Sequence, residues 1–281
     1  MFLKKYFTMV TFAISFFILI NTAVIGQPKP EQITSKEEKE FRWPEGKRAA
    51  ISLSFDDARL SQIDVGIPIL DKYGVKATFY VSPSSVKRRL DGWKKAVANG
   101  HEIGNHTQTH PCTINYGSAR SKNALEYYTL EMMEHELDEA SAVIKKMLGV
   151  RPTTFAYPCG QKYVGRGQNV KSYIPLVAER FIVGREWLSE NSNIPALCDL
   201  SHVMGMKCDG MTFEQVKELI DQTVKNGKWL VLCGHEIRQS GRGLTTFAAT
   251  LEAICEYAQD PANGLWIDTV EKIGRYILEQ R

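Results

Sequence analysis

The chain alternates short apolar runs with amphipathic segments from residue 49 to its end, and this alternation constrains its fold more than any other feature. Runs typical of buried strands occupy 49–55, 75–81, 101–104, 153–157, 180–184, 228–234 and 264–268. Segments with helical periodicity occupy 65–74, 84–100, 123–149, 212–227, 245–260 and 269–281. The alternation indicates an α/β fold, a parallel sheet covered by helices that is either a closed barrel or an open doubly wound sheet.

The N-terminal segment has the layout of a secretory signal peptide. Two lysines precede a long apolar run that ends in small residues, which predicts a signal peptide over residues 1–26 with cleavage near Gly26–Gln27. The alternative is an uncleaved membrane anchor, because the run is almost long enough to span a bilayer. We expect a secreted or periplasmic protein, a flexible polar lead-in over 27–45 and one large domain over 46–281.

The composition narrows the class of protein. The net charge is +3 without a basic run, so nothing indicates a nucleic-acid partner. Six cysteines in an exported chain permit three disulfides, and Cys198 and Cys208 are close enough in sequence to close a small loop. The alternative is that the cysteines are buried free thiols.

Two histidines four residues apart, His106 and His110, lie in the segment HEIGNHTQTH at 101–110. This spacing predicts one face of a helical turn, on which two imidazoles can converge on one ion. The zinc pattern H-E-x-x-H carries a glutamate base, but here Thr107 follows the first histidine. A catalytic metal site therefore needs a third ligand and a base from elsewhere. The alternative is a polar loop that is rich in histidine.

The first strand ends in SFDD, which places Asp56 and Asp57 where α/β enzymes usually carry catalytic groups. Neighbouring residues point in different directions, so one carboxylate can bind metal while the other faces substrate. With His106 and His110, one aspartate gives three ligands and leaves a position open for water. The set suits Zn²⁺, with Co²⁺, Ni²⁺ or Fe²⁺ as alternatives. The pair also fits a helix N-cap followed by a first-turn acid.

Two later strands end in residues that can carry chemistry. Segment FAYPCG contains a Tyr157-Pro158 turn, which can direct a backbone N–H toward a reacting carbonyl. Segment VLCGHE places His235 at the end of the strand that begins at Trp229, where a histidine suits a general acid. Taken alone, a histidine there is more often a core or capping residue.

The four segments SFDD, HTQTH, FAYPCG and VLCGHE occur in an order that resembles the polysaccharide deacetylase family, the NodB-homology domain of carbohydrate esterase family 4, over residues 48–281. The resemblance implies a distorted (β/α) barrel. It also implies an enzyme that uses one divalent metal ion to remove acetyl groups from an N- or O-acetylated poly- or oligosaccharide. On this basis the catalytic domain is residues 46–281.

The resemblance assigns roles at matching positions. It implies that Asp57, His106 and His110 hold the metal ion. It implies that Asp56 is the base that takes a proton from the attacking water. His235 is implied to be the acid that protonates the leaving amine or alkoxide.

The family's turn motif implies that Tyr157 and the backbone N–H of Cys159 lie on the oxyanion and substrate side. This motif often carries an Arg that pairs with the base, at the position of Ala156 here, although some members also have FAYP. Arg185 is our candidate for that orienting role and is grouped with the substrate-side residues. The Asp that tunes the acid histidine is not visible, and Asp199 is a weak candidate.

Two alternative functions stay open. The first is a deacetylase-like domain that binds glycan but is catalytically impaired, which the complete set of metal, base and acid residues disfavours. The second is a C–N hydrolase that acts on a small cyclic amide, which the export signal and the intact ligands disfavour. If the protein is an active deacetylase, chitin-like oligomers, peptidoglycan and acetylated plant polysaccharide all fit as its substrate. Gly234, where family members often have a bulky apolar residue, is a further departure.

Overall fold

Strand β1 (Ala49–Asp56) lies at the centre of the sheet, and all eight of its residues are buried, as expected for a parallel strand covered on both faces. It pairs in parallel with β2 (Thr78–Val81) and with β9 (Trp229–Gly234). β12 (Leu265–Ile267) pairs with the beginning of β1. The central strand of the sheet is therefore the one that ends in the two aspartates.

The computed structural model describes residues 41–116 and 123–281. The predicted signal peptide and residues 27–40 of the predicted lead-in lie outside these ranges. Residues 41–45 pack on the domain: Trp43 is buried, and its ring lies 6.1 Å from that of Trp266 and 6.3 Å from that of Tyr276. The folded domain thus starts before residue 46. In these ranges, no helix is both long and apolar enough to cross a membrane.

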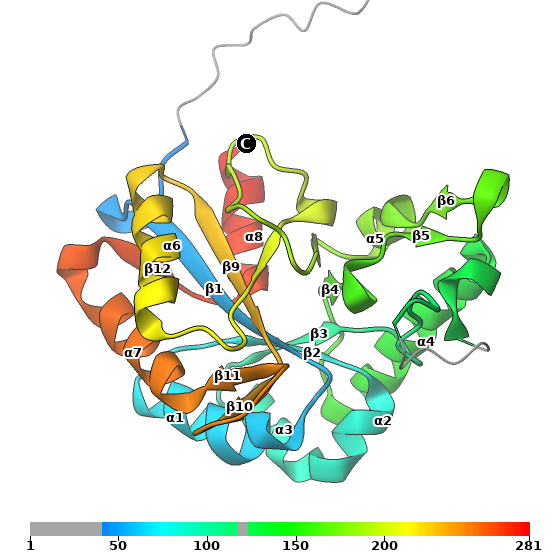
Figure 1. Cartoon of the computed structure of the whole chain (residues 1–281), viewed down its shortest axis with the longest axis horizontal. Coiled ribbons are helices and arrows are strands. Elements are labelled where there is room, and N and C mark those ends of the chain that lie inside the picture. The colour runs from blue at the N-terminus through cyan, green and yellow to red at the C-terminus, as the bar shows by residue number, and fades with distance from the viewer. Residues whose placement is uncertain (1–40, 117–122) are drawn as a thin grey trace, which may run out of the picture. The chain divides into compact units, whose positions relative to one another are not determined.

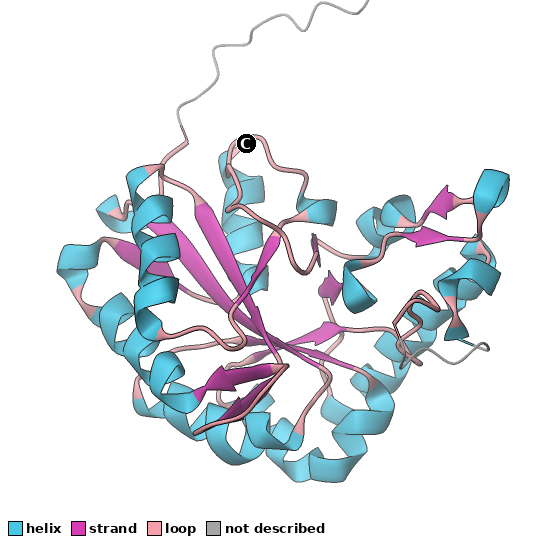
Figure 2. Ribbon diagram, in the orientation of Figure 1, coloured by secondary structure: helices cyan, strands magenta, loops and turns pink. Residues whose placement is uncertain are grey.

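The main sheet of the described residues has eight strands and is almost closed (Figures 1 and 2). Its order is β7 (Val183–Arg185), β4 (Thr154–Ala156), β3 (Glu102–Asn105), β2, β1, β9 and β8 (Gly205–Lys207), with β12 on β1. The first and last strands approach each other through an isolated bridge between Arg185 and Val203, with hydrogen bonds of 2.8 Å on either side. This closure makes the fold the predicted (β/α) barrel and not an open sheet.

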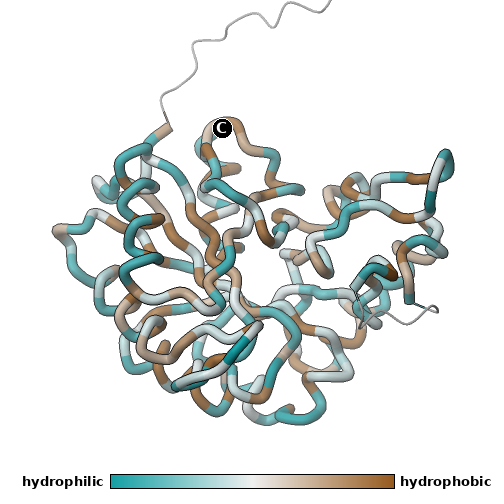
Figure 3. The backbone as a smooth tube through the Cα atoms, in the orientation of Figure 1, coloured by the Kyte–Doolittle hydropathy of each residue, from teal (hydrophilic) through white to brown (hydrophobic). Residues whose placement is uncertain are grey.

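Helices surround the sheet, as Figure 2 shows. They are α1 (Ile67–Lys72), α2 (Pro83–Val86), α3 (Leu90–Ala98), α4 (Leu130–Leu148), α5 (Ile174–Arg180), α6 (Phe213–Lys225), α7 (Ala248–Gln259) and α8 (Val270–Gln280). Apolar residues concentrate along the central strands in Figure 3, and the largest core cluster lies between those strands and the helices. The ring of Phe79 stacks on that of Phe55 and meets that of Trp93 edge to face, which joins β1, β2 and α3.

Local capping explains where the predicted helices begin. The helix predicted over 123–149 begins at Leu130, because Thr129 accepts a hydrogen bond from the backbone of Met132 and a separate turn precedes it. The capping box predicted from Thr212 and Gln215 is present at the start of α6. The segment predicted as one helix over 84–100 is divided into α2 and α3 by a turn.

Six short elements escaped the sequence prediction. α5 and β8 are short and lack a clear period. The pair β5 (Tyr163–Val164) and β6 (Lys171–Ser172) is antiparallel and has two residues in each strand. β10 (Glu236–Arg238) and β11 (Thr245–Phe247) pair outside the barrel, directly after the acid histidine. The barrel edge where β1, β3, β4 and β9 end carries the candidate site.

Candidate active site

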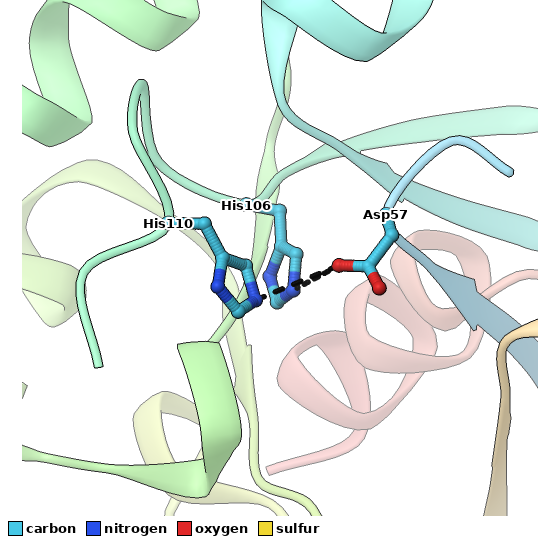
Figure 4. A group of neighbouring side chains, drawn as sticks. All are labelled: Asp57, His106 and His110. Atoms are coloured by element: carbon cyan, nitrogen blue, oxygen red, sulfur yellow. Dashed lines mark ion pairs between the residues drawn. The ribbon is translucent and has the colours of Figure 1, made fainter. Parts of the chain in front are cut away.

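Asp57, His106 and His110 converge at the edge of the barrel (Figure 4). Asp57 Oδ1 lies 3.6 Å from His106 Nε2 and 3.5 Å from His110 Nε2. One ligand atom from each residue lies within 4.8 Å of the others. The three residues come from the loops after β1 and β3, so the predicted trio is assembled by two neighbouring regions of the barrel.

The HTQTH segment is a loop and not the helical turn that its spacing predicted. Thr107 and His110 have φ values of 62° and 56°, which no helix contains. The side chain of Asn105 accepts a hydrogen bond from the Thr107 N–H at 2.7 Å, and Thr107 Oγ1 accepts one from the His110 N–H at 3.0 Å. Side-chain hydrogen bonds to the backbone therefore bring the two imidazoles together, where the prediction relied on helical periodicity.

The protonation states of His106 and Asp57 suit a metal ion. His106 Nδ1 lies 2.9 Å from the Ala156 carbonyl, so it carries the proton and leaves Nε2 free as a ligand. Burial lowers the pKa of His106 to about 4. Burial alone would raise the pKa of Asp57. The nearby His106, His110 and Arg59 have a larger opposite effect and lower this pKa to about 2. A neutral imidazole beside an ionised carboxylate is the combination that metal binding requires.

Asp56, the expected base, forms a buried ion pair with Arg185. The Arg185 guanidinium donates through Nη2 to Asp56 Oδ1, and both side chains are almost fully inaccessible. Arg185 Nη1 also donates to the Glu186 carbonyl at 3.0 Å. Burial lowers the pKa of Arg185, but Asp56 outweighs this and holds it above the usual value. Arg185 therefore contacts the base and does not face the substrate side.

Strand register explains how Arg185 reaches the base. Ala156 on β4 and Arg185 on β7 are direct partners in the parallel ladder. An Arg on β7 can therefore contact Asp56 in place of an Arg at position 156 on β4. This arrangement supports the orienting role that we expected for Arg185, and it shows why a small residue at 156 is compatible with an oriented base.

Neighbouring residues leave room for the buried guanidinium. The ring of Tyr80 lies 4.8 Å below the centre of the Arg185 guanidinium, within cation–π range. A Cβ at Gly205 would lie 2.6 Å from Arg185 Cδ, and a Cβ at Gly104 would lie 2.3 Å from the Tyr80 ring. Glycine at these two positions is thus what allows Arg185 and its aromatic platform to occupy the barrel interior.

His235, the expected acid, is held by Asp209. The ring nitrogen Nδ1 of His235 lies 2.6 Å from Asp209 Oδ2. The backbone N–H of His235 donates to Asp209 Oδ1 at 3.1 Å. Thr246 on β11 donates to the same Oδ1 at 2.9 Å. Asp199, the weak candidate for this role, instead caps a turn by accepting from the Ser201 N–H at 2.9 Å. That candidate was wrong, and the partner of the histidine is Asp209.

The surroundings of His235 keep its protonated form available. Burial lowers its pKa, but the hydrogen bond to Asp209 and the carboxylates of Asp56 and Asp57 outweigh burial and raise it above the usual value. The ring of Trp187 meets the imidazole edge to face, with centroids 5.4 Å apart. A histidine that holds its proton in this way suits the delivery of a proton to a leaving group.

Two further features of this part of the site were not predicted. The buried side chain of Gln62 donates to the carbonyl of Asp56 at 2.7 Å and to that of His235 at 2.9 Å, so one amide joins the backbones of the base and the acid. Gly234 is small because a Cβ there would lie 2.3 Å from Thr246 Oγ1 and 3.0 Å from Phe55. The hydroxyl that supports Asp209 thus occupies the space that a side chain at position 234 would need.

The turn at 158–160 is tied to the loop of metal ligands. Cys159 has a φ of 54° and forms a disulfide with Cys112, two residues after His110. The expected Cys198–Cys208 loop is not formed; the free cysteines are Cys198, Cys208, Cys233 and Cys255. One disulfide is present where the composition permitted three, and three of the four free thiols are buried, as the alternative expectation had it.

Tyr157 is oriented away from the substrate side. Its ring is fully buried, and its hydroxyl donates to the Ser201 carbonyl at 2.7 Å. Burial raises the pKa of this phenol. Its N–H donates to the Arg185 carbonyl at 3.0 Å, which fixes the beginning of the turn. Tyr157 is therefore a support of the turn, and the backbone around Cys159 is the part of FAYPCG that lies beside the site.

Comparison with known proteins gives the same family. The sequence profile described as "Polysaccharide deacetylase" matches residues 44–173. The chain is 28% identical over 160 residues to the peptidoglycan-N-acetylglucosamine deacetylase PgdA of Listeria monocytogenes, and 27% identical over 198 residues to the peptidoglycan-N-acetylmuramic acid deacetylase PdaC of Bacillus subtilis. These matches cover 51% and 68% of this chain, but only 32% and 37% of the relatives. The chain is therefore similar to polysaccharide deacetylases, as its four motifs predicted.

The fold is also shared with a solved esterase structure. A family 4 acetyl xylan esterase from Clostridium thermocellum, solved with a cobalt ion, superposes with a TM-score of 0.53 at 20% identity, covering 83% of this chain and 96% of that one. Ala156 offers no side-chain partner to Asp56, the expected base, and Arg185 on the neighbouring strand supplies one through its ion pair.

Proposed function

We propose that the protein is a metal-dependent hydrolase that removes acetyl groups from an N- or O-acetylated carbohydrate. The observation that carries the proposal is that three metal-compatible ligands, a buried ion-paired carboxylate and an Asp-supported histidine gather at one edge of the barrel. The peptidoglycan deacetylases similar to this chain act on acetylated amino sugars according to their names, which supports the same substrate class here.

Asp57, His106 and His110 would hold one divalent ion. Two imidazole nitrogens and one carboxylate oxygen suit Zn²⁺, with Co²⁺, Ni²⁺ and Fe²⁺ as alternatives. When bound, the ion supplies a Lewis acid that polarises the acetyl carbonyl and lowers the pKa of water. Arg59 donates to Asp57 Oδ2 at 2.7 Å, while Oδ1 faces the imidazoles and would be the ligand atom.

Asp56 and His235 divide the proton transfers. Asp56 takes a proton from the attacking water, and Arg185 fixes the direction of its carboxylate. His235 gives a proton to the leaving nitrogen or oxygen, and Asp209 keeps its Nδ1 proton in place so that Nε2 faces the site. The backbone around Cys159, fixed by the disulfide, would donate to the oxyanion.

The two alternatives predict a different site. A catalytically impaired glycan-binding domain has no need for a buried, ion-paired base or for the Asp209 and Thr246 support of His235. A cyclic-amide hydrolase of this fold would carry altered metal ligands, but Asp57, His106 and His110 all face one point. We therefore keep the deacetylase as the proposal.

Acetate release tests the proposal directly. The mature protein is incubated with chitin oligomers, peptidoglycan and acetylated xylan, before and after removal of metal with a chelator and re-addition of Zn²⁺ or Co²⁺. We expect release that disappears with the chelator and returns with the ion. We expect about one ion per chain, lost when His106→Ala and His110→Ala are combined. Glycan binding with no release under any of these conditions would favour the impaired domain.

We also propose that the protein acts outside the cytoplasm, after cleavage near Gly26–Gln27. The support is the Lys-led apolar segment of the sequence. N-terminal sequencing of material from the culture medium or periplasm should begin near Gln27. Full-length chain recovered from the membrane fraction would favour the uncleaved anchor.

A further inference from the structure

A polar cavity of about 350 Å³ opens beside the metal-ligand trio. Two members of the trio, Asp57 and His110, form part of its wall. Arg59 and Arg88 contribute the positive charge of the lining. The remaining lining residues carry hydroxyl or amide groups: Ser82, Ser84, Ser85, Gln108 and Thr109. Small-molecule sites are mostly lined by apolar side chains, whereas every residue that lines this cavity is polar or charged.

The positive charge of the cavity exceeds what its own carboxylate can neutralise. Arg59 is engaged, because its Nη2 and Nε lie 2.7 Å and 3.1 Å from Asp57 Oδ2. Arg88 is exposed, and its guanidinium has no hydrogen bond or ion pair with any residue in the described ranges. Its neighbour Arg89 differs, since it binds both oxygens of Asp64 at 3.1 and 3.2 Å. Of two consecutive arginines, the free one lines the cavity.

A second polar group of the lining also lacks a partner. The side-chain oxygen of Gln108 is buried and accepts no hydrogen bond from the described residues. Gln108 lies in the same loop as His106 and His110, and it lines the cavity together with His110 and Asp57. An unpaired acceptor and an unpaired guanidinium together match a ligand with a hydroxyl or N–H group and an anionic group.

We infer that this cavity binds the carboxylate of an acidic sugar, so that the substrate is an acetylated glycan with carboxylated units. The inference rests on the proposed function. A guanidinium binds a carboxylate through two parallel N–H bonds, and Arg88 supplies the free fork for it. Two sources provide this group next to acetylated positions: the ring carboxylate of a uronic acid and the lactyl ether carboxylate of a muramic acid.

Matched pairs of substrates test the inference. The first pair is acetylated glucuronoxylan before and after its carboxyl groups are reduced to alcohols. The second is oligosaccharides of N-acetylmuramic acid and of N-acetylglucosamine. The value of kcat/KM for acetate release should favour the acidic member of at least one pair, and that pair identifies the source of the carboxylate. Arg88→Gln should lower this preference about 10- to 100-fold, the usual effect of a charge-assisted hydrogen bond.

Arg89→Gln is the control, because it removes an adjacent exposed arginine that is paired with Asp64. It should keep the preference of the parent protein. If the parent protein releases acetate equally from both members of each pair, or if Arg88→Gln keeps the preference, the inference is wrong while the proposed function stands. Calorimetric titration with a glucuronic-acid xylo-oligosaccharide and with a muramyl oligosaccharide gives a second readout that needs no turnover. Equal affinity of the parent and Arg88→Gln for both probes would also overturn it.

Discussion

The metal-ligand trio and the pairs that support the proton-transfer residues are built in different ways. Asp57 and His110 lie in loops, with φ values of 76° and 56°, and remain partly accessible. Asp56 and Arg185 lie on strands in the barrel interior and exclude solvent almost completely. Solvent can therefore reach the trio at Asp57 and His110, whereas the ion pair between Asp56 and Arg185 is closed to solvent.

This difference separates two requirements of a hydrolytic site. Binding an ion and a water needs access and three donors, which loops supply by short-range hydrogen bonds such as that from the His110 N–H to Thr107. Directing proton transfer needs groups with fixed orientation in a low-dielectric environment, where electrostatic interactions are stronger. The sheet supplies this by placing Arg185 in register with Ala156.

The adjacent aspartates give the largest expected effect and the clearest way to break the comparison. Asp56→Asn keeps size and an acceptor for Arg185 but cannot take a proton, so metal content should be retained and kcat should fall about 10²- to 10⁴-fold. Asp57→Ala should lower metal affinity, because two neutral imidazoles balance the charge of the ion less well. Metal analysis and acetate release measure the two effects. The opposite result, with metal lost from Asp56→Asn and kept by Asp57→Ala, would exchange the roles.

Replacement of Arg185 should have the next largest effect. Arg185→Ala leaves Asp56 without its orienting partner, and we expect about a 10²-fold loss of kcat with little change in KM, because misplacing a reacting group by about 1 Å has this cost. Arg185→Lys keeps the charge but not the planar guanidinium, so its kcat should lie between those of the parent protein and Arg185→Ala. Thermal unfolding is followed in parallel, since an unpaired buried carboxylate is also destabilising.

Moving the arginine sharpens this test. The double variant Ala156→Arg with Arg185→Ala places a guanidinium on the adjacent strand at the paired position. If orientation of Asp56 is what matters, this variant should recover part of the kcat lost by Arg185→Ala. A double variant that folds, binds metal and recovers nothing would show that Arg185 acts in another way.

The sequence predicted the trio but only part of its support, for a physical reason. Metal ligands are recognised by short spacings, such as SFDD and HTQTH, that lie at the ends of apolar runs. Asp209 lies 26 residues from His235 and Arg185 lies 129 residues from Asp56, so their pairing depends on strand register. Arg185 was found because Ala156 departs from a family motif. Asp209 had a weaker signal, since β8, just before it, has no apolar run.

The fold was predicted to a similar extent. Long strands such as β1 and helices with caps such as α6 follow from local sequence. Closure of the barrel depends on a single bridge between Arg185 and Val203, which no local pattern contains. The loop conformation of HTQTH was mispredicted because Asn105 satisfies the backbone in place of a helix.

Replacement of Asp209 tests the buried pair of His235 and Asp209 through the pH dependence of kcat, and its expected effect on kcat is smaller. The raised pKa of His235 keeps its acid form present at higher pH, and this form is lost as pH rises through that pKa. Asp209→Asn removes the charge that contributes to the raised value, so the alkaline limb of the pH–kcat profile should move to lower pH, with about a 10-fold loss at neutral pH. Asp199→Asn, the same change at the turn cap, should leave the profile unchanged. An unshifted limb in Asp209→Asn would separate His235 from proton delivery.

The smallest effect on activity is expected at Glu102, a fully buried carboxyl at the beginning of β3. Burial raises its pKa to about 7, although Thr78 donates to Oε2 at 2.6 Å and the Glu271 N–H donates to the same oxygen at 2.9 Å. The unfolded chain loses this proton near the ordinary pKa of 4.5, while the folded protein holds it until about pH 7. Stability is therefore fully present below about pH 4.5 and falls as pH rises to about 7, by on the order of 3 kcal/mol.

Glu102→Gln should remove this slope, because an amide has no proton to lose in that range. Denaturant unfolding between pH 4.5 and 8 measures it, and kcat at neutral pH should stay within about twofold of the parent value because Glu102 touches none of the reacting groups. A slope that persists in Glu102→Gln would assign the titration to another buried group. The variant also separates the two pH dependences of the molecule. If the alkaline limb of activity is unchanged in Glu102→Gln but shifted in Asp209→Asn, then the pH response of catalysis belongs to the His235 pair and that of folding belongs to the barrel interior.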